Sequence, residues 1–204
     1  MPATDQISKA FPHEPTGQQL ELFDRLHSFL LSDNGDECFI LKGYAGTGKT
    51  TVVGALVKAL KYYNYKSVLL APTGRAAKVI TNYSGRKAFT IHKRIYRKKS
   101  ALNIDDVFRL ADNLATDTLF IVDEASMISD ESAGNMRETL LHDLVSYVYN
   151  TKNCKLMLVG DTAQLPPVGA DNSPALDIPL MKKTFAVDVF NYELTDVLRQ
   201  ERDS

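Results

Sequence analysis

The 204-residue chain contains no tryptophan, only two cysteines and no apolar run near the ~18–20 residues that a membrane-spanning helix needs. Met1 to His13 also lacks the apolar core of a secretory signal peptide. Cys38 and Cys154 fall in short apolar runs that we predict to be buried strands, where reduced packing cysteines are more usual than a disulfide. These absences exclude a transmembrane helix, so we expect no membrane partner and a cytoplasmic location.

Acidic residues are missing from one long stretch of the chain. Between Cys38 and Ile104 there is no Asp or Glu, whereas the same stretch holds fourteen Lys and Arg. The whole chain has a net charge of −1, so the remainder, with ten of the 24 basic residues and all 25 acidic ones, carries −15. Segregation of this kind favours a surface that faces a polyanion such as nucleic acid. A solvated basic face is the alternative.

A glycine-rich turn at residues 43–50, GYAGTGKT, matches the phosphate-loop pattern G-x-x-x-x-G-K-[ST] at every fixed position. An apolar strand precedes it and helical spacing follows it, and backbone N–H groups in such a turn attract anions. The pattern predicts an ATP site in which Lys49 contacts the β- and γ-phosphates and Thr50 binds Mg²⁺. A chance match is the alternative. The residues expected around the nucleotide are Gly43, Ala45, Gly46, Thr47, Gly48, Lys49, Thr50 and Thr51.

Polar side chains follow two further apolar runs. The run Thr118–Val122 ends in Asp123 and Glu124, which would be costly beside an apolar strand without a cation or hydrogen bonds. Near a phosphate loop, Asp123 would hold the Mg²⁺ water shell and Glu124 would polarise the attacking water. The alternative is a strand-end pair that caps the next helix. The run Lys155–Val159 leads to Gln164, a neutral group that can contact the γ-phosphate and water together.

The first strongly periodic segment is an amphipathic helix that starts after Thr16, a good N-cap residue, and ends near Leu31. Gln19 lies in its first turn, where an amide can pair with the adenine edge; an exposed, solvated glutamine is the alternative. Residues 1–15 are expected to be a flexible lead-in. With the buried strands that follow, the pattern predicts an α/β fold of three layers, a mainly parallel central sheet between helices, over residues 16–204.

Three further segments complete the predicted order of elements. Apolar positions at helical spacing indicate a long helix from Asp130 to Asn150. A last strand is expected at Tyr192–Thr195. The segment from Leu102 to Ala115 is ambiguous between a helix and an excursion from the sheet edge.

The basic stretch contains candidate DNA contacts at one predicted sheet edge. A strand over Ser67–Ala71 ends in a turn with Thr73 and Arg75, groups that suit a phosphodiester backbone. The run Ser84–Ser100 interleaves basic and aromatic side chains, as single-strand binding requires, although a short helix that packs Ile91 and Ile95 inward would fit as well. The candidate DNA-binding residues are Thr73, Arg75, Thr90, His92 and Lys93.

Taken in order, the motifs resemble the first, RecA-like motor domain of superfamily-one DNA helicases, most closely the RecD/Dda-like branch that includes the exonuclease V alpha subunit. The matching blocks are Gln19, GYAGTGKT (43–50), APTGRAA (71–77), TIH (90–92), DEAS (123–126), GDTAQLPPV (160–168) and LTDVLRQ (194–200). Seven blocks in the family's order are far more specific than the phosphate loop alone.

The resemblance implies a role for each matched residue. Gln19 matches the adenine-reading motif, Lys49 and Thr50 match the phosphate loop, and Asp123 and Glu124 match the metal and base positions. Gln164 matches the γ-phosphate sensor, and Arg199 matches an arginine that reaches the γ-phosphate. Thr73, Arg75, Thr90 and His92 fall in blocks that contact single-stranded DNA. The resemblance also implies 5′-to-3′ movement and repair-complex subunits as partners.

The family pattern continues beyond this sequence. The second motor domain is absent after Ser204, so we expect the chain to be a fragment of a longer helicase with little activity alone. Residues 93–117 are the candidate for a short inserted strand-separating pin. Two other classes compete with a helicase motor: a small-molecule P-loop kinase, which leaves the basic stretch unexplained, and a non-catalytic DNA-binding module, which leaves the intact catalytic residues unexplained.

Overall fold

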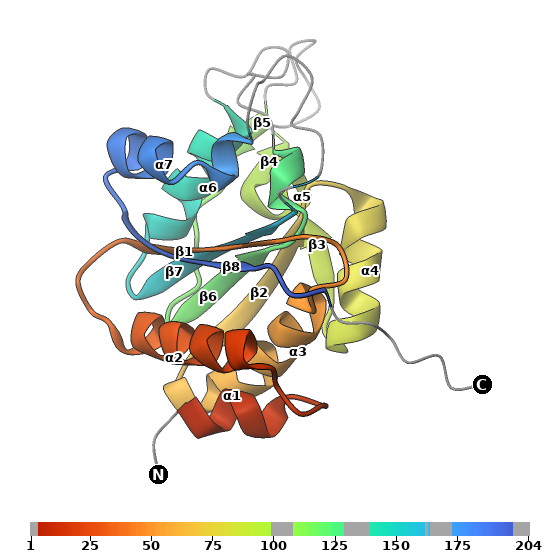
Figure 1. The fold of residues 1–204 in the computed structure, drawn as a ribbon. Helices are drawn as coiled ribbons and strands as arrows, with labels where there is room; N and C mark the ends of the chain where they lie inside the picture. Colours follow the sequence, from red (N-terminus) through yellow and green to blue (C-terminus); the bar gives the residue numbers. More distant parts are fainter. Residues whose placement is uncertain (1–3, 99–107, 129–138, 162, 164–172, 198–204) are drawn as a thin grey trace.

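The computed structural model describes residues 4–98, 108–128, 139–161, 163 and 173–197, and its centre is a six-stranded sheet (Figure 1). The strand order is β3-β2-β6-β7-β1-β8, and every neighbouring pair is parallel. This confirms the predicted parallel sheet, because buried parallel strands read as continuous apolar runs. The strands are β1 (Glu37–Gly43), β2 (Lys66–Ala71), β3 (Ala88–Thr90), β6 (Thr118–Val122), β7 (Cys154–Gly160) and β8 (Asp188–Leu194).

Helices cover both faces of the sheet, as Figure 1 shows. One core cluster joins the sheet to α1 (Thr4–Ala10), α2 (Gly17–Leu31), α3 (Lys49–Ala59), the 3-10 turn η1 (Leu60–Tyr63) and α4 (Gly74–Ser84). The second joins it to α5 (Ile91–Ile95), η2 (Ala125–Met127), α6 (Leu140–Tyr149), η3 (Pro174–Leu176) and α7 (Ile178–Phe185). Alternation along β1 serves both cores: Phe39 faces the first and Ile40 the second. The predicted three layers are therefore confirmed.

Side-chain caps set where most of these helices begin. Thr16 and Gln19 form a reciprocal capping box at the start of α2, at the predicted position. Helix α6 begins later than predicted, at Leu140, because the Thr139 hydroxyl accepts a hydrogen bond from the His142 backbone N–H at 3.2 Å. Residues 130–138 of the predicted helix lie outside the described part of the chain.

The prediction of a flexible lead-in over residues 1–15 is wrong for its central part. Residues Thr4–Ala10 form α1, and Ile7 is fully buried. Phe11 is also buried and its ring packs edge-on against Phe23, with 5.4 Å between the centroids. Ile7 and Phe11, four positions apart, pack this short helix against α2 and α3. Two apolar residues are too few to give a periodic pattern that identifies a helix from the sequence.

The chain after α5 contains a small antiparallel pair, whose second strand lies in the ambiguous segment Leu102–Ala115. Strand β4 (Tyr96–Lys98) pairs with β5 (Phe108–Leu110), beside α5 in Figure 1. The backbone N–H of Ala111 then donates to the carbonyl of Ile95 at 2.7 Å, which ties the end of the excursion to α5. Of the predicted segment Leu102–Ala115, the described residues 108–115 hold a strand and no helix, which favours the excursion over the helix. Residues 99–107 lie outside the described residues.

Two predictions from composition can be compared with the fold. None of the helices in the described part of the chain is both long and apolar enough to cross a bilayer. Cys38 and Cys154 are buried free thiols, as predicted, and burial raises the pKa of both. Neither thiol is therefore set up as a reactive thiolate.

Candidate nucleotide site

The strand order brings the predicted catalytic segments to one edge of the sheet. Strand β7 lies between β1, which leads into the glycine-rich turn, and β6, which ends before Asp123. Because parallel strands end at the same edge, Asp161 after β7 is placed between Lys49 and Asp123. Open α/β sheets bind their ligands at this carboxyl edge.

The glycine-rich turn needs its glycines for two different reasons. Gly46 and Gly48 have φ angles of 82° and 88°, in the left-handed region that favours glycine. A Cβ atom on Gly43 would lie 2.7 Å from the carbonyl oxygen of Leu194 and 2.9 Å from the Thr47 hydroxyl, so only glycine lets the turn approach β8 this closely. Thr47 is buried and its hydroxyl donates to the carbonyl of Tyr44 at 2.8 Å.

The other residues predicted to surround the nucleotide are in place along the turn and the start of α3. Ala45 is exposed at the outer part of the turn. Helix α3 begins at Lys49, so Thr50 and Thr51 lie in its first turn, with Thr50 exposed. The turn therefore lies at a helix N-terminus, where backbone N–H groups attract phosphate groups.

Lys49 folds back onto the turn in this structure. Its Nζ atom donates to the carbonyls of Gly43 at 2.7 Å and Tyr44 at 2.8 Å. Burial lowers the pKa of Lys49, and the negative charges of Asp161, Asp123 and Glu124, in that order, oppose the shift. The carbonyls of the turn thus hold Lys49 Nζ at the sheet edge where Asp123, Glu124 and Asp161 follow their strands.

Asp123 is held by hydrogen bonds to both of its carboxylate oxygens. Oδ1 accepts from the backbone N–H of Glu124 at 2.9 Å, and Oδ2 accepts from the Tyr83 hydroxyl at 2.9 Å. Burial and then the charge of Asp123 raise the pKa of the Tyr83 hydroxyl, so it stays protonated and donates. These bonds offset the cost of placing a carboxylate at the tip of an apolar strand.

Glu124 adopts an uncommon backbone conformation. Its φ of 55° and ψ of 35° lie in the left-handed region, which costs a non-glycine residue about 1–3 kcal/mol. The alternative role of Glu124 as a helix cap is not what the structure shows, because its side chain makes no capping hydrogen bond to η2.

Gln19 is buried rather than solvated, with an exposed fraction of 2%. Its Oε1 accepts from the Thr16 backbone N–H at 3.0 Å, whereas its Nε2 is buried with no hydrogen-bond partner among the described residues. An unpaired buried amide costs roughly 1–3 kcal/mol, so Gln19 Nε2 has the capacity to donate one further hydrogen bond. The predicted alternative of an exposed glutamine is therefore excluded.

The start of α2 is connected to the glycine-rich turn through the end of β8. The Gln18 side chain makes two hydrogen bonds to Thr195 and one to Asp196. The next residue, Val197, has its Cγ1 atom 3.5 Å from the position that a Cβ on Gly46 would take. The predicted residues Gln164 and Arg199 lie outside the described residues.

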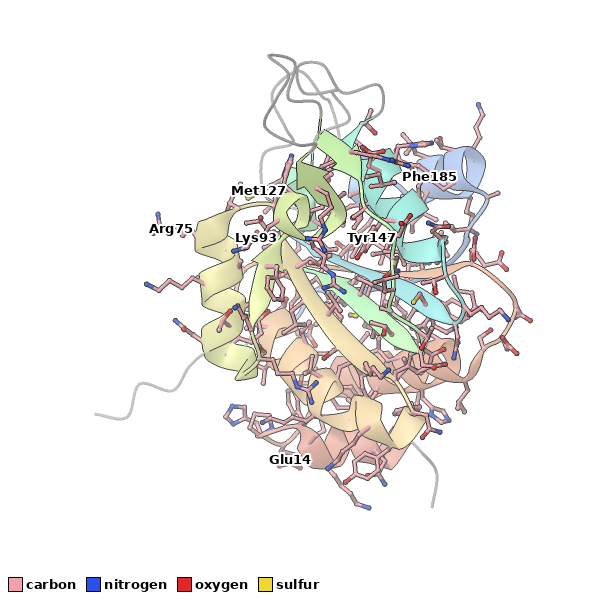
Figure 2. All side chains as sticks on the ribbon, turned by 180° about the vertical axis from the view of Figure 1, so that it is seen from behind. Glu14, Arg75, Lys93, Met127, Tyr147 and Phe185 are labelled. Atoms are coloured by element: carbon pink, nitrogen blue, oxygen red, sulfur yellow. The ribbon has the colours of Figure 1, made fainter. Side chains whose placement is uncertain are left out.

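The predicted DNA contacts meet at the same sheet edge. Ala71 at the end of β2 pairs with Thr90 at the end of β3, so the turns that follow both strands are neighbours. The hydroxyls of Thr73 and Thr90 cap α4 and α5, accepting from Ala76 N and Lys93 N at 3.2 Å each. The exposed charged or ionisable side chains here are Arg75, which extends outward from α4 in Figure 2, with His92 and Lys93 on α5.

Sequence reasoning missed two residues of the site. Asp161 has a detectable signal, since it follows a buried strand in the same way as Asp123 does. Tyr83 has none, because it reaches Asp123 across 40 positions from the last turn of a helix.

No group of three or more His, Cys, Asp or Glu among the described residues is arranged to hold a metal ion. Mg²⁺ in nucleotide sites commonly takes one or two carboxylates together with substrate phosphates and waters. The Thr50 hydroxyl and the Asp123 carboxylate, at the edge where phosphates would lie, fit that mode of binding.

The sheet order, the glycine-rich turn and the lysine among carboxylates define a P-loop NTPase domain, a fold that binds nucleotides. A family model described as an AAA domain matches residues 18–204, and the chain belongs to that family. A structure of Bacteroides sp Pif1 in complex with ADP-AlF4 has the same fold, with a TM-score of 0.52 at 20% identity over 91% of this chain and 43% of that one.

Sequence relatives agree with the predicted resemblance to superfamily-one helicases. The ATP-dependent RecD2 DNA helicase of Deinococcus radiodurans is 31% identical over 166 residues, which make up 81% of this chain and 20% of that protein. The ATP-dependent DNA helicase dda of Enterobacteria phage T4 is 28% identical over 162 residues, 78% of this chain and 34% of that protein. The chain is thus a distant relative of these helicases and spans about a third of their length or less.

Proposed function

We propose that this chain is the ATP-binding first motor domain of a DNA helicase or translocase of the superfamily-one kind. The observation that carries the proposal is the position of Lys49, whose Nζ lies against the glycine-rich turn at the sheet edge where β6 ends before Asp123 and β7 ends before Asp161. The relatives named as ATP-dependent DNA helicases support the same reaction.

The turn and its lysine supply the phosphate site. Phosphate oxygens would replace the Gly43 and Tyr44 carbonyls as acceptors for Lys49 Nζ, because a charge-assisted bond to an anion is stronger than a bond to a neutral carbonyl. Gln19 Nε2, which is buried and has no hydrogen-bond partner in the described part of the chain, would donate to the adenine ring. ATP is therefore the nucleotide that we assign to the site.

Mg²⁺, when bound, would supply positive charge that offsets the negative charge of the phosphates. Thr50 and Asp123 are the residues that would hold it. Glu124, in its left-handed conformation, would orient and deprotonate the attacking water. Gln164 and Arg199 keep the roles that the family resemblance gives them, as γ-phosphate sensor and as a cation that stabilises the transferred phosphoryl group.

Single-stranded DNA is the proposed second ligand. The start of α4 offers backbone N–H groups and Arg75, and the neighbouring start of α5 offers His92 and Lys93, all at the exposed edge. These residues lie in the stretch that lacks acidic side chains, which favours a phosphodiester backbone over a small substrate. The activity of a small-molecule kinase would not explain why exposed basic side chains gather at this edge.

In the longer helicase, we infer that a second motor domain closes over the nucleotide and supplies a further arginine. The β4–β5 pair would serve as the base of a strand-separating pin, and movement would run 5′ to 3′, as the resemblance implies. An arginine supplied by a partner contributes ~10³–10⁵ in rate to phosphoryl transfer. We therefore expect this chain alone to bind nucleotide and hydrolyse it very slowly.

Phosphate release from Mg-ATP, measured with and without single-stranded DNA, tests this function. The expected result is a rate near background for this chain and a DNA-stimulated rate for the longer helicase, abolished there by Glu124→Gln. Normal hydrolysis by the Glu124→Gln helicase would refute the assigned base. Transfer of the γ-phosphate to a small-molecule acceptor would favour the kinase instead.

A further inference from the structure

Among the described residues, the Asp123 carboxylate has one local and one remote hydrogen-bond partner. The local bond, from Glu124 N–H to Oδ1, arises within the strand-end turn itself. The remote bond, from the Tyr83 hydroxyl to Oδ2, comes from helix α4. A carboxylate that accepts at both oxygens cannot rotate about its terminal torsion without losing one of the two bonds.

Tyr83 is itself firmly placed. Its ring packs against the core cluster on the α1–α4 face of the sheet. The last turn of α4 is tied to the start of β3 and to the turn before it, since Thr81 Oγ1 accepts from Ala88 N at 3.0 Å and Ser84 Oγ accepts from Arg86 N at 3.2 Å. The hydroxyl therefore reaches Asp123 from a rigid support and not from a mobile surface side chain.

The bond leaves Asp123 able to bind a cation. Two carboxylate oxygens carry about four lone-pair sites, and the Tyr83 and Glu124 bonds occupy two. Hydrogen bonds from outer partners fix the orientation of metal ligands, and losing one typically lowers metal affinity 10–100-fold. Tyr83 stands to Asp123 as such an outer partner.

We propose that Tyr83 is a positioning residue for magnesium-dependent nucleotide binding: its hydroxyl holds the Asp123 carboxylate in the orientation that receives Mg²⁺ or its water shell. This inference rests on the proposed nucleotide site. The Tyr83 hydrogen bond also links the Asp123 carboxylate to α4, the helix whose first turn carries the proposed DNA contact Arg75.

The test compares Tyr83→Phe with Tyr96→Phe. The Tyr96 hydroxyl also donates to a carboxylate, that of Asp143 on α6, with 2.6 Å to Oδ2. Tyr96→Phe therefore controls for the loss of a tyrosine–carboxylate hydrogen bond away from Asp123. Binding of a fluorescent ADP derivative is followed at rising Mg²⁺ and in EDTA, and circular dichroism verifies folding. For Tyr83→Phe we expect a Mg²⁺ midpoint about 10-fold higher than wild type, at the lower end of outer-partner effects.

The same variant should bind ADP in EDTA as wild type does, and Tyr96→Phe should keep the wild-type midpoint. In an Asp123→Ala background, Tyr83→Phe should have no further effect, since the hydroxyl acts only through Asp123. A folded Tyr83→Phe chain with an unchanged or lower Mg²⁺ midpoint would overturn the inference alone. A wild-type chain without magnesium-dependent ADP binding would overturn the proposed function and the inference with it.

Discussion

The side-chain amide of Gln18 binds the backbone of Thr195, 177 positions further along the chain. Its Oε1 accepts from the backbone N–H groups of Thr195 at 3.0 Å and Asp196 at 3.2 Å, and its Nε2 donates to the Thr195 hydroxyl at 2.8 Å. The helix that carries Gln19 is thereby joined to the end of β8, whose carbonyl at Leu194 lies against the glycine-rich turn.

Replacing Gln18 should weaken this connection measurably. Because hydrogen bonds contribute about 0.5–1.5 kcal/mol each and this side chain is only partly buried, we expect Gln18→Ala to lower the free energy of unfolding by about 1–2 kcal/mol in urea titrations. Gln18→Glu keeps the acceptor for both backbone N–H groups and should lose less. Equal losses in the two variants would mean that the backbone bonds contribute nothing.

The pair Glu37–Lys155 predicts a larger effect at the opposite edge of the sheet. Both side chains are almost fully buried, and Lys155 Nζ also donates to the carbonyl of Ser32 at 2.9 Å. Lys155→Met leaves the buried Glu37 carboxylate without its cation, with the Ser32 hydroxyl still donating to Oε1, and should cost about 3–5 kcal/mol. The double variant Glu37→Leu/Lys155→Met should recover most of that loss in urea titrations. A double variant as unstable as the single one would contradict this explanation.

Tyr65 predicts how stability changes at high pH. Burial, followed by the charges of Glu37 and Asp117, raises the pKa of Tyr65 from 10.0 to about 12. Between these values the unfolded chain has lost the phenolic proton and the folded chain keeps it, so stability falls as pH rises. The contribution is fully present below pH 10.0 and is lost as the pH approaches about 12.

Across that pH window the free energy of unfolding should therefore fall more for wild type than for Tyr65→Phe, which has no phenolic proton to lose. The exposed Tyr62 provides the control, as Tyr62→Phe keeps the buried hydroxyl of Tyr65. Unfolding free energies from denaturant titrations at stepwise pH give the comparison. Parallel pH profiles for wild type and Tyr65→Phe would show that Tyr65 does not contribute.

Arg75 predicts a sequence-independent effect on DNA binding. As a proposed phosphate contact, Arg75→Ala should weaken binding of all single-stranded sequences alike and reduce the slope of log K against log salt by about 1. Fluorescence anisotropy with labelled oligonucleotides at several salt concentrations measures both quantities. Lys58→Ala, which removes an exposed lysine on α3, is the control. Wild-type binding that does not respond to salt would contradict a phosphate-contact surface.

The sequence specified the parts of this fold that depend on local patterns. The buried strands were predictable because parallel strands flanked by helices are apolar along their whole length, as in Thr118–Val122. The glycine-rich turn and the Thr16 cap were predictable because their backbone conformations require particular residues. Helix α1 was not, since its stability comes from Ile7 and Phe11 packing on distant elements.

Contacts in the site that cross the fold could not be derived from local patterns. Nothing in the residues around Tyr83 indicates that its hydroxyl reaches Asp123, because the two meet only after α4 packs on the sheet. The position of Asp161 between Lys49 and Asp123 follows from strand order, which a list of strands does not contain. Burial of Gln19 Nε2 likewise depends on how α2 packs.

The central claim is that Lys49 binds the phosphates of a nucleotide, and titration of a fluorescent ATP derivative with Mg²⁺ tests it most directly. Wild type and Lys58→Ala should bind saturably, with unlabelled ATP as competitor. Lys49→Ala should bind about 10–100-fold more weakly, as expected for a lost charge-assisted hydrogen bond of ~1.5–3 kcal/mol. Equal affinities for wild type, Lys58→Ala and Lys49→Ala would contradict the account.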